Sequence, residues 1–179
     1  MRFFADPELA YERWTFYLFA TTDGHSEWSG WQIHCLASED LTHWQDRDVV
    51  IDLHDQHLDG SGRTNILPGH AWVPVLAVRD GRYYLYFCGD GQANVAVSDH
   101  IDGGYALQGD LARTSSHAAR HGFGTGIVAP GIDPAAFRDP QTGRWYLAWG
   151  RTGRATPACP TTCCASSPKP RPTSGRPHI

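Results

Sequence analysis

Three stretches with one layout decide the fold: ADPELAYERWTFYLFATTDG (5–24), WVPVLAVRDGRYYLYFCGDG (72–91) and IDPAAFRDPQTGRWYLAWG (132–150). In each stretch, a Pro at position 7, 74 or 134 precedes an aromatic-rich Tyr-Leu pair by ten or twelve residues. The Tyr-Leu pairs themselves are 67 and 62 residues apart. Two apolar runs joined by turn residues such as Asp-Gly are typical of a β-hairpin. The sequence therefore predicts one hairpin-based unit that occurs three times.

Additional strands are predicted inside the first two units. WQIHCLAS (31–38) and DLTHW (40–44) indicate two strands joined by a turn, and NVAVSD (94–99) indicates the third strand of the second unit. Four short strands per unit at such a period are typical of a β-propeller. A closed propeller needs at least four blades, so this all-β chain, with two full units and the opening of a third, resembles part of one. A β-sandwich is the rival fold, which the long period disfavours.

The composition changes abruptly after residue 150. From Arg151 onward the chain has five basic residues and no acidic ones, half of the 12 prolines, three of the five cysteines, and no Phe, Trp or Tyr. Such a segment buries too little apolar surface to offset its chain entropy. We therefore predict a folded domain over 1–150 and a disordered tail over 151–179. Cys159, Cys163 and Cys164 lack the paired spacing and the fourth ligand of a zinc site, so no metal is expected.

Charge and hydropathy bear on location and partners. The formal net charge is −4, yet all 19 acidic residues precede Arg151, so the folded part is expected to repel nucleic acid. No apolar stretch approaches the roughly 18 residues of a membrane span. The start, MRFFADPELA, lacks the apolar region of a secretion signal. We expect a cytoplasmic protein with no nucleic-acid or membrane partner, unless the start of this sequence lies inside a longer gene. A second hypothesis is that the reading frame shifts near Arg151 and the tail is translated out of frame.

In their order and spacing, four segments resemble glycoside hydrolase family 43. They are FADPEL (4–9), CLASEDLTHWQDRDVVIDL (35–53), AWVPVLAVRDGRYYLYF (71–87) and GIDPAAFRDPQTGRWYLAWG (131–150). Members of this family are five-bladed β-propellers that cleave arabinose- and xylose-containing polysaccharides. The resemblance implies a partial five-bladed propeller of about two and a half blades. It also implies hydrolysis of O-glycosyl bonds with inversion, without a cofactor, on arabinose- or xylose-containing oligo- or polysaccharides.

The candidate site residues come from the repeated Asp-Pro. An Asp before a Pro is ordinarily a turn residue, but Asp6 and Asp133 occupy equivalent repeat positions and should both face the propeller axis. An inverting glycosidase needs one carboxylate as base and one protonated carboxyl group as acid. By resemblance, Asp6 is the general base, and Asp133 orients the acid and raises its pKa by like-charge proximity. Trp72, at the corresponding position of the second unit, is predicted to form an aromatic wall for a sugar ring. The alternative for Trp72 is a core position between blades.

The general acid has no counterpart in this sequence. In the family it is a Glu in an E-G-P-like motif of the fourth blade, whereas the glutamates of this chain lie in the first unit and lack that context: Glu8, Glu12, Glu27 and Glu39. We therefore expect little or no glycosidase activity from this chain by itself. Two other interpretations stay open, a non-catalytic carbohydrate-binding propeller and an interaction scaffold. The sequence does not distinguish arabinofuranosidase, xylosidase and arabinanase activities.

Overall fold

The computed structural model describes residues 4–22, 30–54, 70–89, 92–107, 129–130, 132–150 and 162–166. Within these ranges every regular element is a β-strand, and the strands form three antiparallel sheets. The first sheet contains β1 (Ala5–Glu12), β2 (Thr15–Thr21), β3 (Gln32–Ser38) and β4 (Gln45–Asp52). The second contains β5 (Ala71–Arg79), β6 (Arg82–Gly89), β7 (Gln92–Ser98), β8 (Ala106–Leu107) and β9 (Ala129–Pro130). The third contains β10 (Ile132–Arg138), β11 (Trp145–Gly150) and β12 (Thr162–Ser166).

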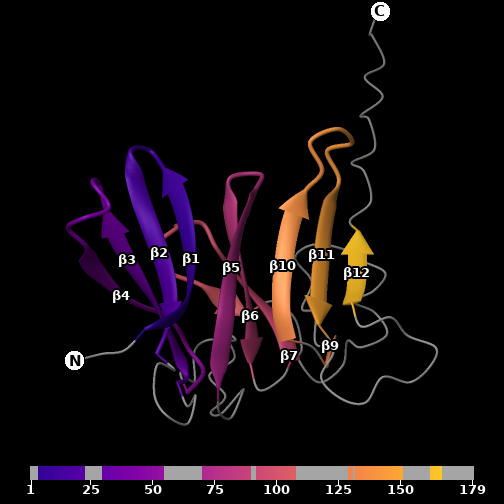
Figure 1. Ribbon diagram of the computed structural model, residues 1–179, viewed down its shortest axis with the longest axis horizontal. Helices are drawn as coiled ribbons and strands as arrows, with labels where there is room; N and C mark the ends of the chain where they lie inside the picture. Colours follow the sequence, from indigo (N-terminus) through magenta and orange to yellow (C-terminus); the bar gives the residue numbers. More distant parts are fainter. Residues whose placement is uncertain are drawn as a thin grey trace, which may run out of the picture.

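The three sheets stand side by side as consecutive blades of a β-propeller. Figure 1 shows β1, β5 and β10 as neighbouring strands, with β5 between the other two. Each of these inner strands starts its own sheet and pairs with the next strand of the chain. The predicted all-β, partial-propeller fold is thereby confirmed. No helix in the described part of the chain is long and apolar enough to cross a membrane.

Tight turns close the hairpins that the sequence predicted. Asp80 and Gly81, between β5 and β6, have φ angles of 52° and 76°. Two successive residues with positive φ match the type I′ turn whose twist fits a β-hairpin, and Asp-Gly is favoured there. Arg13 and Trp14 adopt the same region between β1 and β2, with φ angles of 49° and 69°. This turn carries Trp14 into solvent, with 84% of the residue exposed.

Two apolar clusters lie between the sheets, one on each face of the second sheet. The first joins β2, β3 and β4 to β6, β7 and β8, and includes Phe19, Ile33, Ile51, Leu85, Phe87 and Leu107. The second joins the opposite face to the third sheet, and includes Ala77, Tyr86, Val95, Val97 and Leu147. Because successive strand residues point to opposite faces, Leu85 and Phe87 of β6 enter one cluster and Tyr86 enters the other. The middle blade is therefore buried on both sides.

Two predicted boundaries differ from the structure. DLTHW (40–44) forms a turn, and β4 begins only at Gln45. The turn is favoured because the Asp40 carboxylate accepts hydrogen bonds from the backbone N–H groups of Thr42 and His43 at 2.8 and 2.7 Å. In the segment predicted to be a disordered tail, Thr162–Ser166 forms β12, which pairs with β11 as the third strand of the third sheet. The predicted tail otherwise lies outside the described residues.

Candidate active site

The inner strands of all three blades begin with the same β-bulge. The pairing register shifts between Ala5 and Glu8, between Trp72 and Val75, and between Ile132 and Ala135. In each case two residues of the inner strand oppose one residue of its partner, and the second of the two is a Pro. A Pro fits there because a bulge interrupts the ladder and needs no N–H donor. The repeated Asp-Pro of the sequence is thus one structural device.

The residue before each Pro adopts a left-handed backbone conformation. The φ angles are 46° for Asp6, 49° for Val73 and 54° for Asp133. Asp tolerates this region better than most residues, whereas a β-branched Val there is an outlier that the surrounding structure must hold. The equivalence of Asp6 and Asp133 is confirmed by this geometry. The residue equivalent to them in the second blade is Val73, so the predicted register of Trp72 is wrong by one position.

Asp6 is fixed by the second blade. The backbone N–H of Val73 donates to Oδ2 of Asp6 at 3.3 Å. The strained conformation of Val73 therefore has a local consequence, because its N–H is directed at the carboxylate of the neighbouring blade. A hydrogen bond to a charged acceptor orients it more firmly than one to a neutral group. Asp6 is in this way held at the start of β1, facing β5.

Glu8 is a second carboxylate on the same side of β1. Its Oε1 accepts a hydrogen bond from the backbone N–H of Leu76 at 3.3 Å. Burial raises the pKa of the Glu8 carboxyl above its ordinary value, and the hydrogen bond from Leu76 opposes that shift. Reasoning from sequence gave Glu8 no role, although its two-residue spacing from Asp6 was a signal for a shared strand face.

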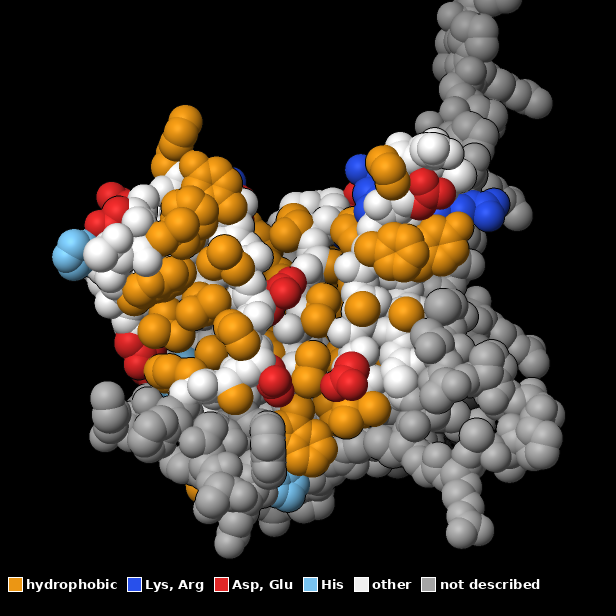
Figure 2. Space-filling view, viewed as in Figure 1, with side chains coloured by type: hydrophobic (Ala, Val, Ile, Leu, Met, Phe, Trp, Pro, Cys, Tyr) orange, Lys and Arg blue, Asp and Glu red, His pale blue; other side chains and the backbone are white. Residues whose placement is uncertain are grey.

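Asp133 lies on the opposite side of β5, at the start of β10. Its side chain is exposed, and it has no hydrogen-bond partner within the described ranges. Figure 2 shows acidic and hydrophobic side chains together in the hollow between the first and third sheets. The structure thus brings Asp6 and Asp133 to corresponding positions on the two strands that flank β5. Their predicted catalytic roles stay predictions.

Trp72 lies between these two carboxylate-bearing strands, at the start of β5. It is half-buried, and its ring stacks on His70 with centroids 4.9 Å apart and planes 18° apart. Reasoning from sequence missed His70. The sequence shows only that it lies two residues before Trp72, and the ring stack becomes visible in the folded chain, where His70 directly precedes β5. The aromatic wall predicted at this place therefore consists of two rings. Its contact with a sugar stays a prediction.

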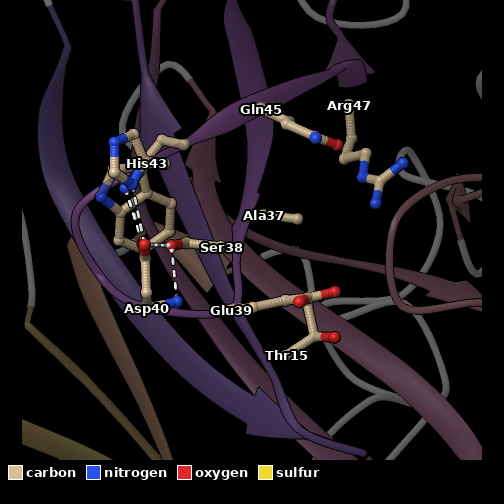
Figure 3. Close-up of a pocket in the computed structure, with 9 residues that line it drawn as sticks. Thr15, Ala37, Ser38, Glu39, Asp40, His43, Gln45 and Arg47 are labelled. Atoms are coloured by element: carbon tan, nitrogen blue, oxygen red, sulfur yellow. Dashed lines mark hydrogen bonds and ion pairs between the residues drawn. The ribbon is translucent and has the colours of Figure 1, made fainter.

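A pocket of about 240 Å³ lies at the other end of the first blade. Figure 3 shows its walls, with Thr15 and Glu39 on one side and Gln45 and Arg47 on the other. The pairing register places it far from Asp6, because Thr15 opposes Glu12 whereas Ala5 opposes Thr21. This pocket is therefore separate from the candidate active site.

The carboxylate of Asp40 in that pocket already serves the turn. Its Oδ2 accepts a hydrogen bond from Nδ1 of His43 at 2.7 Å. This side-chain bond and the backbone N–H groups of the turn hold the pKa of Asp40 well below its usual range. In the portion of the chain that the structure describes, no three His, Cys, Asp or Glu side chains gather in a way that could hold a metal ion.

Comparison with known proteins identifies the group to which these features belong. Residues 1–165 match the sequence profile of the glycosyl hydrolases of family 43. This match continues past residue 150 and includes most of β12. A probable arabinan endo-1,5-α-L-arabinosidase D of Emericella nidulans is 36% identical over 90 residues, which cover 44% of this chain and 22% of that protein. An extracellular endo-α-(1→5)-L-arabinanase of Thermotoga petrophila is 24% identical over 143 residues, or 67% of this chain and 30% of that protein.

Solved structures show the same fold. The β-xylosidase RS223 superposes with a TM-score of 0.62 at 20% identity, covering 83% of this chain and 44% of that chain. A family 43 enzyme of Xanthomonas citri complexed with xylotriose superposes with a TM-score of 0.60 at 24% identity, covering 82% of this chain and 39% of the other. The chain thus spans less than a third of the curated relatives and less than half of these structures.

Proposed function

Because the chain belongs to glycosyl hydrolase family 43, we propose that it supplies the base side of a glycosidase site for arabinan- or xylan-type glycans. The observation that carries the proposal is the repeated bulge, which presents Asp6 and Asp133 from equivalent places on the two strands flanking β5. The names of the curated relatives favour arabinan, and the xylotriose complex favours xylan. The shared substrate class is a linear chain of pentose units.

In the proposed reaction, Asp6 acts as general base on a water molecule. The carboxylate takes a proton from the water, and the oxygen of that water attacks the anomeric carbon on the face opposite the leaving oxygen. The bond to the leaving oxygen breaks, and that oxygen takes a proton from a separate carboxylic acid, so the anomeric configuration inverts. The N–H of Val73 supports this role because it fixes the direction of the Asp6 carboxylate.

Asp133 is proposed to act on the acid and not on the sugar. A second carboxylate close to a carboxylic acid disfavours ionisation of that acid, which keeps the acid protonated until the leaving oxygen requires the proton. The exposure of Asp133, with no partner in the described part of the chain, is compatible with a group that faces residues of a further blade.

The acid itself is proposed to lie outside these 179 residues. Glu8 and Glu12 are tied to the second blade, and Glu39 lines the pocket at the far end of the first blade. Glu27 lies outside the described residues, and its sequence lacks the E-G-P-like context of the family's acid. General acid catalysis contributes about 10²–10⁴-fold. We therefore expect this chain alone to leave 4-nitrophenyl α-L-arabinofuranoside, 4-nitrophenyl β-D-xyloside and linear arabinan intact or nearly so.

A substrate that needs no protonation separates the two roles. Fluoride leaves a glycosyl fluoride without help from an acid, so a chain that holds the base should release fluoride from arabinofuranosyl or xylosyl fluoride. Asp6→Asn should abolish that release, and Asp133→Asn should affect it far less, because Asp133 is assigned to the missing acid. Release that survives Asp6→Asn, or turnover of the 4-nitrophenyl glycosides that Asp6→Asn abolishes, would overturn the assignment.

A carbohydrate-binding role without hydrolysis is the second candidate. The ring stack of Trp72 and His70 beside Asp6 favours it, because stacked aromatic faces suit the apolar faces of sugar rings. Binding of arabino- or xylo-oligosaccharides by the chain, without fluoride release from either fluoride, would support this alternative over catalysis.

A further inference from the structure

We propose that Trp31 and His54 form a second sugar-binding platform beside the candidate active site, occupied by another unit of the same linear pentose chain. The proposal rests on the proposed function for the identity of the ligand, since the first unit is the one bound at Trp72 and Asp6. It rests on separate residues for the site itself. Trp31 precedes β3 and His54 follows β4, so both lie at one end of the first blade.

The two rings form a stack that is open to solvent. Their centroids are 4.9 Å apart and their planes differ by 26°. His54 is exposed, and 43% of Trp31 remains accessible. A large aromatic ring exposed in this way leaves apolar surface in water, which a sugar ring can cover with its C–H face while its hydroxyl groups stay hydrated. A pre-stacked pair offers that surface without a large loss of side-chain freedom on binding.

Hydrogen bonds clamp both ends of the platform. Asp52 accepts from Nε2 of Gln32 at 2.8 Å through Oδ2, and from the backbone N–H of His54 at 2.9 Å through Oδ1. The backbone N–H of Leu53 donates to the carbonyl of Trp31 at 3.0 Å, and Leu53 is fully buried. One carboxylate and one backbone bond thus join the residues next to Trp31 to those next to His54. The stack is therefore a built feature of the blade end.

A backbone hydrogen bond connects this platform to the first one. The backbone N–H of Ala71 donates to the carbonyl of Gly30 at 2.7 Å. Trp31 follows Gly30 directly and Trp72 follows Ala71 directly, so the two tryptophans leave adjacent points of neighbouring blades. Val73, the next residue after Trp72, donates to Asp6. The strand register also places the start of β3, next to Trp31, at the same end of the sheet as the start of β1, next to Asp6. Ile33 opposes Thr21, and Thr21 opposes Ala5.

Among the described residues of the blade, a second exposed tryptophan provides the contrast. Trp14 is 84% exposed, lies in the β1–β2 turn at the far end of the sheet, and has no ring partner in the described ranges. Trp14 therefore shares the residue type and exceeds the exposure of Trp31, but has neither the stack nor the clamp. It is a matched control for non-specific contact between an indole and a polysaccharide.

Two platforms at one end imply a ligand of more than one sugar unit. A single arabinose or xylose can occupy only one platform, whereas an oligosaccharide can reach both. The affinity of the chain should therefore increase with oligosaccharide length, and the increase should depend on Trp31. This dependence favours a substrate bound along its chain over one bound only by its terminal unit.

The test measures binding of linear α-1,5-arabinan and of arabino-oligosaccharides from one to six units to the full 179-residue chain. Xylo-oligosaccharides of the same lengths serve as the second series. Trp31→Ala should weaken binding of the longest oligosaccharides about five- to tenfold and leave the single-unit ligand unaffected. His54→Ala should give a smaller loss, and Trp14→Ala should change nothing. Trp31→Phe, which keeps an aromatic face, should retain part of the affinity and covers the case in which the Ala variant fails to fold.

Three results would overturn the platform. These are equal losses for Trp31→Ala and Trp14→Ala, no dependence of affinity on length, and no binding of either polymer series by the wild-type chain. Failure of the proposed function has a different signature, because fluoride release that is absent or independent of Asp6 leaves the length-dependent binding through Trp31 in place. Conversely, fluoride release that requires Asp6 with a Trp31→Ala variant that binds normally refutes the platform alone.

Discussion

The second blade has two interfaces, and they are built differently. Towards the first blade it combines an apolar cluster with hydrogen bonds that it donates to carboxylates of β1, and towards the third blade the described contacts form an apolar cluster. Carboxylates at Asp6, Glu8 and Glu12 accept from Val73, Leu76 and Tyr83 respectively. Placing a charged group in a blade interface requires a desolvation free energy that apolar contacts do not require. The costlier interface is the one that contains the candidate base.

The alternation of side chains along β1 explains how one strand places three carboxylates in the interface. Residues 6, 8, 10 and 12 are partly buried against the second blade, whereas Leu9 and Tyr11 on the opposite face are 53% and 56% exposed. The same strand thus offers acidic acceptors on one face and apolar surface on the other. In the third blade, Phe137 is likewise 53% exposed. The apolar faces at both ends of the three-blade array match a propeller that continues on either side.

The largest expected effect comes from the two apolar clusters. Phe87→Ala removes a fully buried ring from the first cluster and should lower the free energy of unfolding by about 3–5 kcal/mol. Leu147→Ala in the second cluster should cost about 2–3 kcal/mol, because that cluster is smaller and several of its members are only partly buried. Equilibrium urea unfolding measures both values.

Equal losses of unfolding free energy for the two variants would contradict the idea that the two apolar clusters stabilise the blades to different extents. Phe87→Leu replaces Phe87→Ala if the latter does not fold, and should still cost more than Leu147→Met at the other interface.

The next effect concerns the hydrogen bond between Tyr83 and Glu12. The phenol O–H donates to Oε2 of Glu12 at 2.6 Å, and Tyr83 is 8% exposed. Tyr83→Phe should cost about 1–2 kcal/mol, because a bond to a charged acceptor is lost while the ring remains packed. In a double-mutant cycle with Glu12→Gln, a coupling energy near zero would show that this contact does not join the blades.

Much of this arrangement could be predicted from the sequence, and the reasons are local. The hairpins follow from apolar runs joined by Asp80-Gly81, and the equivalence of positions 6 and 133 follows from the repeated Asp-Pro. The strand β12 could not be predicted, because Thr162–Ser166 has weak apolar patterning and gains its place by pairing with β11. The turn at 40–44 was predicted to be a strand, because the apolar pattern does not register the bonds of Asp40 to the backbone.

The site was predictable only in part, for a related reason. Asp6 and Asp133 stand out by repetition, whereas Glu8 becomes notable only when Leu76 is placed beside it. The ring stacks of Trp72 with His70 and of Trp31 with His54 depend on strand ends that meet in three dimensions. Spacing in the sequence reveals repeated positions, but it does not reveal partners from different blades.

A smaller effect is expected from the charge of Glu8. Its pKa is raised in the folded chain, so its contribution to stability is complete below its ordinary value of 4.5 and is lost as the pH rises through the folded value. Glu8→Gln keeps an acceptor for Leu76 and removes the charge. From pH 4 to pH 8 the variant should therefore gain stability relative to the wild type, by about 0.5 kcal/mol for a half-exposed group.

Thermal unfolding at a series of pH values measures that difference. Glu39→Gln, at the far end of the blade, is the matched control for loss of a carboxylate outside the interface. If the stability of Glu8→Gln and of the wild type changed in parallel with pH, ionisation of the Glu8 carboxyl in the interface would not destabilise the folded chain.

The last effect distinguishes the two bulge carboxylates themselves. Asp6 and Asp133 have φ angles of 46° and 54°, so an Ala at either position has nearly the same backbone strain. That strain cancels in a comparison of Asp6→Ala with Asp133→Ala. What remains is the hydrogen bond from Val73, which only Asp6 makes in the described part of the chain. We expect Asp6→Ala to be less stable than Asp133→Ala by about 0.5–1.5 kcal/mol in urea unfolding.

The sign of that difference tests the comparison of the two interfaces at its most specific point. Asp6→Asn retains an oxygen acceptor and tolerates a positive φ, so it should recover most of the loss. If Asp133→Ala were as destabilising as Asp6→Ala, Asp133 would have to be held in the folded chain as firmly as Asp6. The third bulge would then be a fixed carboxylate site in its own right, and the second blade would no longer be the feature that sets Asp6 apart.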